Sequence, residues 1–140
     1  MLDQLNNINS ENLREAILFF EQNRIVDKML LESEVVSQNN YGGIFLQLKS
    51  NASNRFSITI NKNNPVLISS LMFHPKITID ELIGIFPKFS KKYVPYDEEL
   101  YFSFENTLTG CIIGAYTNAG ALKDVSNKPE NTILRMSLTW

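Results

Sequence analysis

The stretch GGIFLQLKSNASNRFSITI, residues 42–60, decides the fold class of this chain. Apolar side chains alternate with other residues at period two over residues 44–49 and again over residues 56–60, which is typical of half-buried strands. The polar residues 50–54 between the two runs favour a turn. The stretch therefore predicts a β-hairpin.

Strand signals continue beyond this hairpin toward the C-terminus. Asn63, Asn64 and Pro65 supply a second turn, and the largely apolar residues 66–73 follow it, so a three-stranded meander is expected. The last third of the chain predicts three more strands, separated by segments that contain Asn, Gly and Pro. These three strands are expected over residues 100–104, 110–116 and 132–140.

Two helices are predicted around these strands. Asn9 or Ser10 can cap an N-terminal helix, because apolar residues recur at helical spacing over residues 13–20. Residues 25–38 leave two alternatives open, which are a continuation of this helix and a strand over residues 29–36. Thr78 and Glu81 form a capping box that predicts a short middle helix, ending near Pro87.

These elements predict a single α+β domain over residues 1–140. Its fold consists of an N-terminal helix, a mainly antiparallel sheet of about five to six strands and one short middle helix, with helices on one face of the sheet. The residues expected in its core are those at the apolar phase of each element: Leu13, Ile17, Phe20, Leu46, Ile58, Ile60, Leu71, Leu82, Phe102, Ile112 and Leu138.

Composition and charge limit where the chain acts and what it binds. Its single cysteine excludes an internal disulfide and favours a reducing compartment, and the first residues lack a secretory signal, so a cytoplasmic protein without a membrane segment is expected. Residues 41–92 carry seven bases against two acids, but the net charge of the whole chain is −2. The net charge therefore argues against nucleic-acid binding.

The sequence offers few residues for chemistry. His74 is the only histidine and Cys111 the only cysteine, and neither lies in a local signature of a nucleophile or a metal site. The acidic pairs are better explained by capping and by solvated faces, and the standard phosphate-binding glycine loops are absent. We therefore predict no catalytic, cofactor-binding or metal-binding residue, and no enzymatic activity.

The segment 88–99 is the candidate functional loop. It mixes lysines, aromatic residues, proline and acids, a composition that favours an ordered surface loop over a regular element. Its aromatic side chains can act as rigid anchors, and its acids can meet a basic partner. The alternative is a loop folded back onto the core with half-buried tyrosines. The candidate partner-binding residues are Tyr93, Tyr96, Asp97, Glu98 and Glu99.

In overall profile, this small acidic α+β chain resembles the immunity proteins that bacteria encode beside polymorphic or contact-dependent toxins. The resemblance implies a protein module without catalysis or cofactor, which binds a cognate toxin domain and neutralises it. One alternative is a secretion chaperone or adaptor that binds an extended client at a sheet edge. Another is a small-ligand-binding protein or enzyme with a pocket between sheet and helix. The sequence predicts no oligomeric state.

Overall fold

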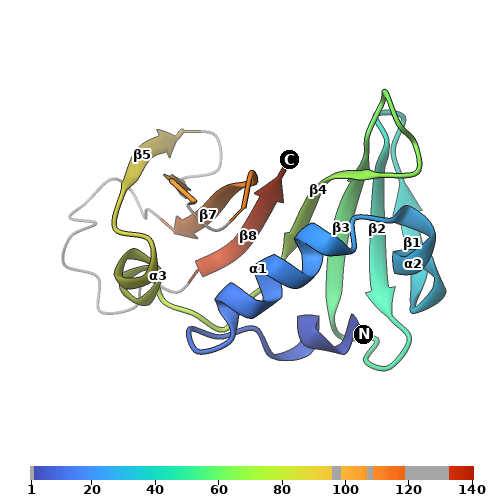
Figure 1. Cartoon of the computed structure of the whole chain (residues 1–140), viewed down its shortest axis with the longest axis horizontal. Coiled ribbons are helices and arrows are strands. Elements are labelled where there is room, and N and C mark those ends of the chain that lie inside the picture. The colour runs from blue at the N-terminus through green and yellow to red at the C-terminus, as the bar shows by residue number, and fades with distance from the viewer. Residues whose placement is uncertain (1, 96–98, 107–108, 119–132) are drawn as a thin grey trace.

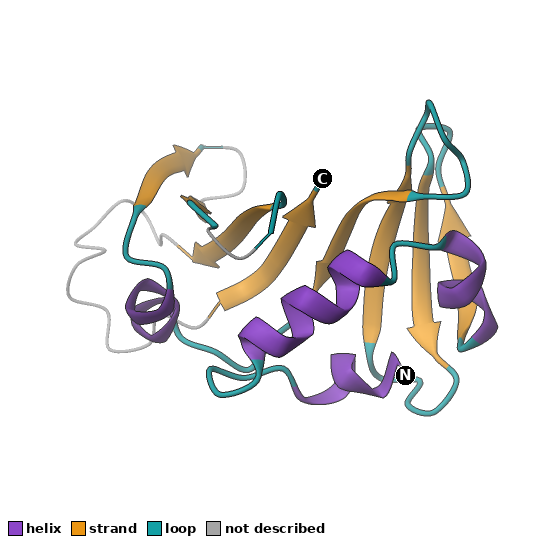
Figure 2. Ribbon diagram, viewed as in Figure 1, coloured by secondary structure: helices purple, strands orange, loops and turns teal. Residues whose placement is uncertain are grey.

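The computed structural model describes residues 2–95, 99–106, 109–118 and 133–140. The described chain forms one eight-stranded antiparallel sheet with three α-helices and a 3₁₀ helix, which confirms the α+β class (Figure 1). Figure 2 shows α1 running across the sheet in front of β4.

The sheet consists of two four-stranded meanders joined side by side. Consecutive strands pair antiparallel within each meander, and β4 pairs with β8 to join the two. The order β1-β2-β3-β4-β8-β7-β6-β5 leaves β1 and β5 as the sheet edges. The strands are β1 (Ser33–Gln38), β2 (Gly43–Leu48), β3 (Arg55–Ile60), β4 (Ile68–Phe73), β5 (Phe89–Val94), β6 (Glu99–Phe104), β7 (Ile112–Asn118) and β8 (Ile133–Thr139).

The expectation of five to six strands is wrong, because the sheet has eight strands and the sequence did not predict the two edge strands, β1 and β5. Residues 25–38 contain both of the elements left open, a short helix and then β1. The predicted loop 88–99 contains β5 and the start of β6. Both edge strands are exposed along most of their length, so neither shows the apolar alternation that reveals a half-buried strand.

The helices are η1 (Leu2–Asn7), α1 (Leu13–Gln22), α2 (Val26–Leu31) and α3 (Ile79–Ile85). Helix α1 begins later than the predicted cap at Asn9 or Ser10. The side chain of Asn9 instead accepts hydrogen bonds from the backbone amides of Glu11 and Asn12, and so it stabilises the turn before the helix.

The capping box of α3 is confirmed. The Thr78 hydroxyl accepts from the Glu81 amide at 3.2 Å, and the Glu81 carboxylate accepts from the Thr78 amide at 3.1 Å. Hydrogen bonds lower the pKa of Glu81. The largest effect comes from the Ser10 side chain, and smaller effects come from the backbone and side chain of Thr78. The helix ends at Ile85, shortly before Pro87, as predicted.

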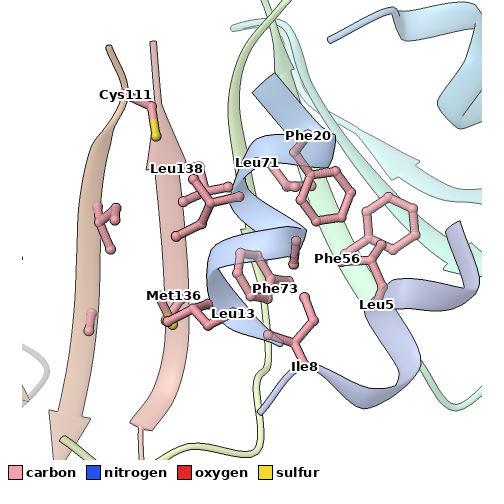
Figure 3. Close-up of a cluster of buried hydrophobic side chains, with 14 of the residues drawn as sticks. Leu5, Ile8, Leu13, Phe20, Phe56, Leu71, Phe73, Cys111, Met136 and Leu138 are labelled. Carbon is pink, nitrogen blue, oxygen red and sulfur yellow. The ribbon is translucent and has the colours of Figure 1, made fainter. Parts of the chain in front are cut away.

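The core lies between the helices and one face of the sheet, which we call the inner face (Figure 3). The rings of Phe20 on α1 and Phe73 on β4 lie 6.3 Å apart between centroids. Nine of the eleven predicted core residues are buried: Leu13, Ile17, Phe20, Leu46, Ile58, Leu71, Leu82, Phe102 and Leu138.

The other two predicted core residues differ from expectation. Ile60 is partly buried against the core, whereas Ile112 is 53% exposed, so its assignment to the core is wrong. In β7 it is Ile113 that pairs with Leu138 and is fully buried, while Ile112 pairs with Thr139 on the opposite face. The continuous apolar run 111–113 does not reveal which of its residues points inward.

Candidate protein-binding surface

The sheet has a second face, the outer face, which points away from the core. The buried side chains of α1, α2 and α3 all belong to the core cluster, so these helices pack on the inner face. Strand register places Phe45, Ser57, Met72, Ser137 and Gly114 in one row across the outer face, each paired with the next. Small polar side chains thus alternate with large apolar ones along this row.

An open hollow of about 430 Å³ lies in this face at β1, β2, β3, β4 and β8. Its apolar lining includes Val36, Phe45 and Met72, and its polar lining includes Ser37 and Ser57. Val36 is 45% exposed and Phe45 is 47% exposed, so water reaches both side chains. The hollow therefore presents accessible apolar surface with a few polar groups, as binding sites commonly do.

Three basic side chains form a neighbouring row at the hollow. Because Ser57, Met72 and Ser137 are paired in register, the positions two residues away on the same side are Arg55, His74 and Arg135. All three line the hollow. Within the described part of the chain, no carboxylate lines it. This side of the hollow therefore favours an anionic group where an arginine is not already paired with a carboxylate of the chain.

Arg135 is held in place by its neighbours. Its guanidinium donates two hydrogen bonds to the carboxylate of Glu99, at 3.1 and 2.9 Å, and lies 4.1 Å from the centroid of the Tyr116 ring. The Tyr116 ring in turn packs against Tyr101 with centroids 4.9 Å apart. Such bidentate pairs fix both position and orientation, so Arg135 forms a rigid wall of the hollow.

We expect Arg135→Ala to lower the free energy of unfolding by about 1.5–3 kcal/mol. The variant loses a charge-assisted bidentate pair and leaves Glu99, whose side chain is only 13% exposed, without its base. Urea denaturation at neutral pH measures the effect, and a double-mutant cycle with Glu99→Gln isolates the pair. The matched control is Arg55→Ala, expected to change stability by less than about 0.5 kcal/mol. Equal losses in the two alanine variants would contradict this description.

Arg55 differs from Arg135 in that its side chain is exposed. No ion pair or hydrogen bond of its guanidinium is found among the residues that the structure describes. An exposed arginine without an internal carboxylate keeps its planar donor group available to a partner. Arg55 is therefore the basic side chain of the row best suited to bind a ligand.

Exposed apolar side chains also occur around the edge strand β1, on both sides of the sheet edge: by register Val35 lies opposite the inner-face residue Leu46, whereas Val36 and Phe45 line the hollow. The exposed apolar side chains come from the end of α2, from β1, from the turn after it and from β2, and they are exposed by 45–79%. Apolar groups gathered in this way mark interaction surfaces more often than single exposed residues do. The members of this β1-edge surface are Leu31, Val35, Val36, Tyr41 and Phe45.

The partner-binding residues predicted from the sequence are only partly described. Tyr93 lies in β5 and is partly buried against the core. This agrees with the alternative in which the segment 88–99 folds back onto the core with half-buried tyrosines. Glu99 forms the ion pair with Arg135. The predicted residues Tyr96, Asp97 and Glu98 lie outside the described residues. The binding role of this segment stays a prediction.

The structure does not bring the only histidine and the only cysteine together. His74 is exposed and lines the outer hollow, whereas Cys111 is 3% exposed and belongs to the core cluster on the inner face. Burial raises the pKa of the Cys111 thiol, against the opposing effect of hydrogen bonds from Thr109 and Asn106. A buried thiol with a raised pKa is a poor nucleophile.

Sequence reasoning missed the hollow, although two signals point to it. The excess of bases over residues 41–92 includes Arg55, and the outward phase of the predicted strands contains Phe45 and Met72. What the sequence did not reveal is that β8 lies beside β4, which brings Arg135 next to these residues.

Comparison with models of protein families, with curated proteins and with solved structures finds no match to this chain. Among the described residues, no helix is long and apolar enough to cross a membrane. In the same part of the chain, no group of three or more His, Cys, Asp or Glu side chains is placed to hold a metal ion.

Proposed function

We propose that this protein is a non-catalytic binding module whose outer face meets another protein. The observation that carries the proposal is that two exposed apolar side chains, Val36 and Phe45, line the hollow of the outer face beside Arg55. Apolar anchors beside an arginine are the usual centre of a protein interface. Arg55 and Phe45 both line the hollow, so an arginine and an apolar anchor lie together there. Binding of this kind requires only a shaped surface.

The partner proposed is a cognate toxin domain, so that the protein acts as an immunity protein in the cytoplasm. The support is the profile of the chain, a small α+β domain with a net charge of −2 and an accessible apolar face. Occupation of the outer face by the toxin domain would block the active site of the toxin or its access to substrate. The candidate residues Tyr93, Tyr96, Asp97, Glu98 and Glu99 are proposed to extend this contact, and of these Glu99 lies next to the hollow through its ion pair with Arg135.

A second candidate function is that of a secretion chaperone or adaptor that binds an extended client. The observation in its favour is β1, an edge strand that carries Val35 and Val36 but no lysine or proline. Natural edge strands are commonly protected by lysine, proline, other charges or bulges; β5 carries Lys91 and Lys92, whereas β1 has Glu34 and a bulge between Val35 and Ser37. A client strand added to β1 would protect the exposed backbone groups of β1 from hydrogen exchange, which a toxin bound only to the hollow would not do.

Co-expression tests the immunity proposal. Products of the genes that flank the coding sequence are expressed in a heterologous bacterium, alone and together with this protein. We expect one product to stop growth and co-expression of this protein to restore it, with a direct complex between the two purified proteins. If no flanking product is toxic, or if this protein neither binds nor protects, the immunity proposal is wrong.

A further inference from the structure

We propose that the hollow of the outer face receives an apolar side chain that the partner presents together with a carboxylate. The apolar group would lie against Phe45 and Met72, and the carboxylate would pair with the guanidinium of Arg55. This inference rests on the proposed function, because it names the chemistry by which the partner is recognised. It predicts an acidic, apolar segment on the partner.

The apolar half of the site follows from the lining of the hollow. Val36, Phe45 and Met72 are among the residues that line an open hollow of about 430 Å³, which is large enough for an aromatic or a branched aliphatic side chain. Phe45 is half-exposed, so a group that enters the hollow removes apolar surface of both partners from water. The Met72 side chain is flexible and can adapt to groups of different shape.

The charged half follows from the distribution of ionic groups. Glu99 already neutralises Arg135, which leaves Arg55 as the arginine of the row without a carboxylate among the described residues. The segment that supplies β2, β3 and β4 belongs to residues 41–92, which carry seven bases and two acids, and both acids lie at α3. A carboxylate therefore meets attraction from Arg55 at this position; the acid nearest in register on this face is Glu34 of β1, which accepts a hydrogen bond from Gln47, the strand neighbour of Arg55.

The geometry also separates the roles of the two arginines. The ion pair with Glu99 and the contact with Tyr116 hold Arg135 as a fixed wall. Arg55, at the start of β3 and exposed, can turn its planar donor group toward an incoming carboxylate. The carboxylate is thus expected at the Arg55 side of the hollow, and the apolar group between Phe45 and Met72.

A titration followed by NMR tests this chemistry with a defined probe. The probe is N-acetyl-phenylalanine, which carries an apolar side chain and a carboxylate on one amino-acid frame, and N-acetyl-phenylalanine amide is its matched neutral control. At millimolar concentrations we expect the acid to shift the signals of Phe45, Arg55 and the Met72 methyl group. We expect the amide to bind at least about fivefold more weakly, because it lacks the charge-assisted hydrogen bond to Arg55.

Two variants of the whole chain distinguish a specific contact between Arg55 and the carboxylate of the probe from a general effect of positive charge on binding. Arg55→Gln should bring the affinity for the acid down to that for the amide, whereas Lys62→Gln, in the exposed turn after β3, should leave the preference for the acid unchanged. Equal binding of acid and amide, or shifts confined to residues outside the hollow, would overturn the inference. So would the absence of any shift.

The same measurements separate this inference from the proposed function. If the protein protects cells against a toxin but shows no preference for the acid in the hollow, the binding module stands and its proposed recognition chemistry is wrong. If the hollow prefers the acid but no protein partner binds the outer face, the proposed function is wrong and the site binds a small organic acid instead.

Discussion

Replacing Phe73 by alanine is expected to lower the free energy of unfolding by about 3–5 kcal/mol, the usual cost of truncating a buried phenylalanine. Phe73 is 2% exposed and packs against the ring of Phe20 on α1. It also lies in β4, the strand through which the two meanders are joined. A cavity at this position therefore weakens both the contact with the helix and the centre of the sheet.

The matched control is Phe45→Ala, which removes the same side chain from the outer face of the same sheet. Phe45 is 47% exposed, and we expect its truncation to cost less than about 1 kcal/mol. Urea denaturation of both variants gives the comparison. Similar losses for the two variants would show that Phe45 is part of a packed core, which would contradict the assignment of the two faces.

The second large effect concerns binding. Phe45→Ala combined with Arg55→Glu is expected to lower the affinity for the protein partner at least about thirtyfold, because truncating one central aromatic or arginine anchor commonly costs about 2 kcal/mol or more and the costs of two such anchors do not simply add. The melting temperature should change little, since both side chains are exposed and Arg55 has no ion pair among the described residues. Calorimetric titration with the purified partner measures the affinity.

Helix α1 offers a control of the same chemistry. Leu18→Ala combined with Arg14→Glu also truncates an exposed apolar side chain and reverses an arginine, but on the solvent-facing side of α1. This variant should bind the partner with unchanged affinity. If the α1 variant loses binding and the outer-face variant retains it, the partner binds on the helical side and the assignment of the binding surface is wrong.

The sequence predicted those parts of the fold in which one face of an element is buried. The alternation over residues 44–49 and 56–60 became β2 and β3, and the helical spacing over residues 13–20 became α1. The Thr78 capping box predicted the start of α3 correctly, because a local pair of hydrogen bonds determines it. In each of these cases the signal lies within a few residues.

The missed features depend on contacts that are distant in the sequence. The edge strands β1 and β5 each have a single strand neighbour and little burial, so no apolar pattern reveals them. Pairing of β4 with β8 brings Arg135 to the same row as Arg55, 80 positions away in the chain. The candidate site could not be assembled from the sequence, because it exists only once the two meanders meet.

Hydroxyl-radical footprinting of the protein, alone and in complex with a purified protein partner, tests whether the outer face is the binding surface. Oxidation of exposed side chains reports their access to water on both faces in one experiment. We predict that labelling of Phe45, Met72 and His74 falls on complex formation, while labelling of Leu18 on α1 is unchanged. Protection of Leu18, with Phe45, Met72 and His74 labelled as in the free protein, would contradict the account.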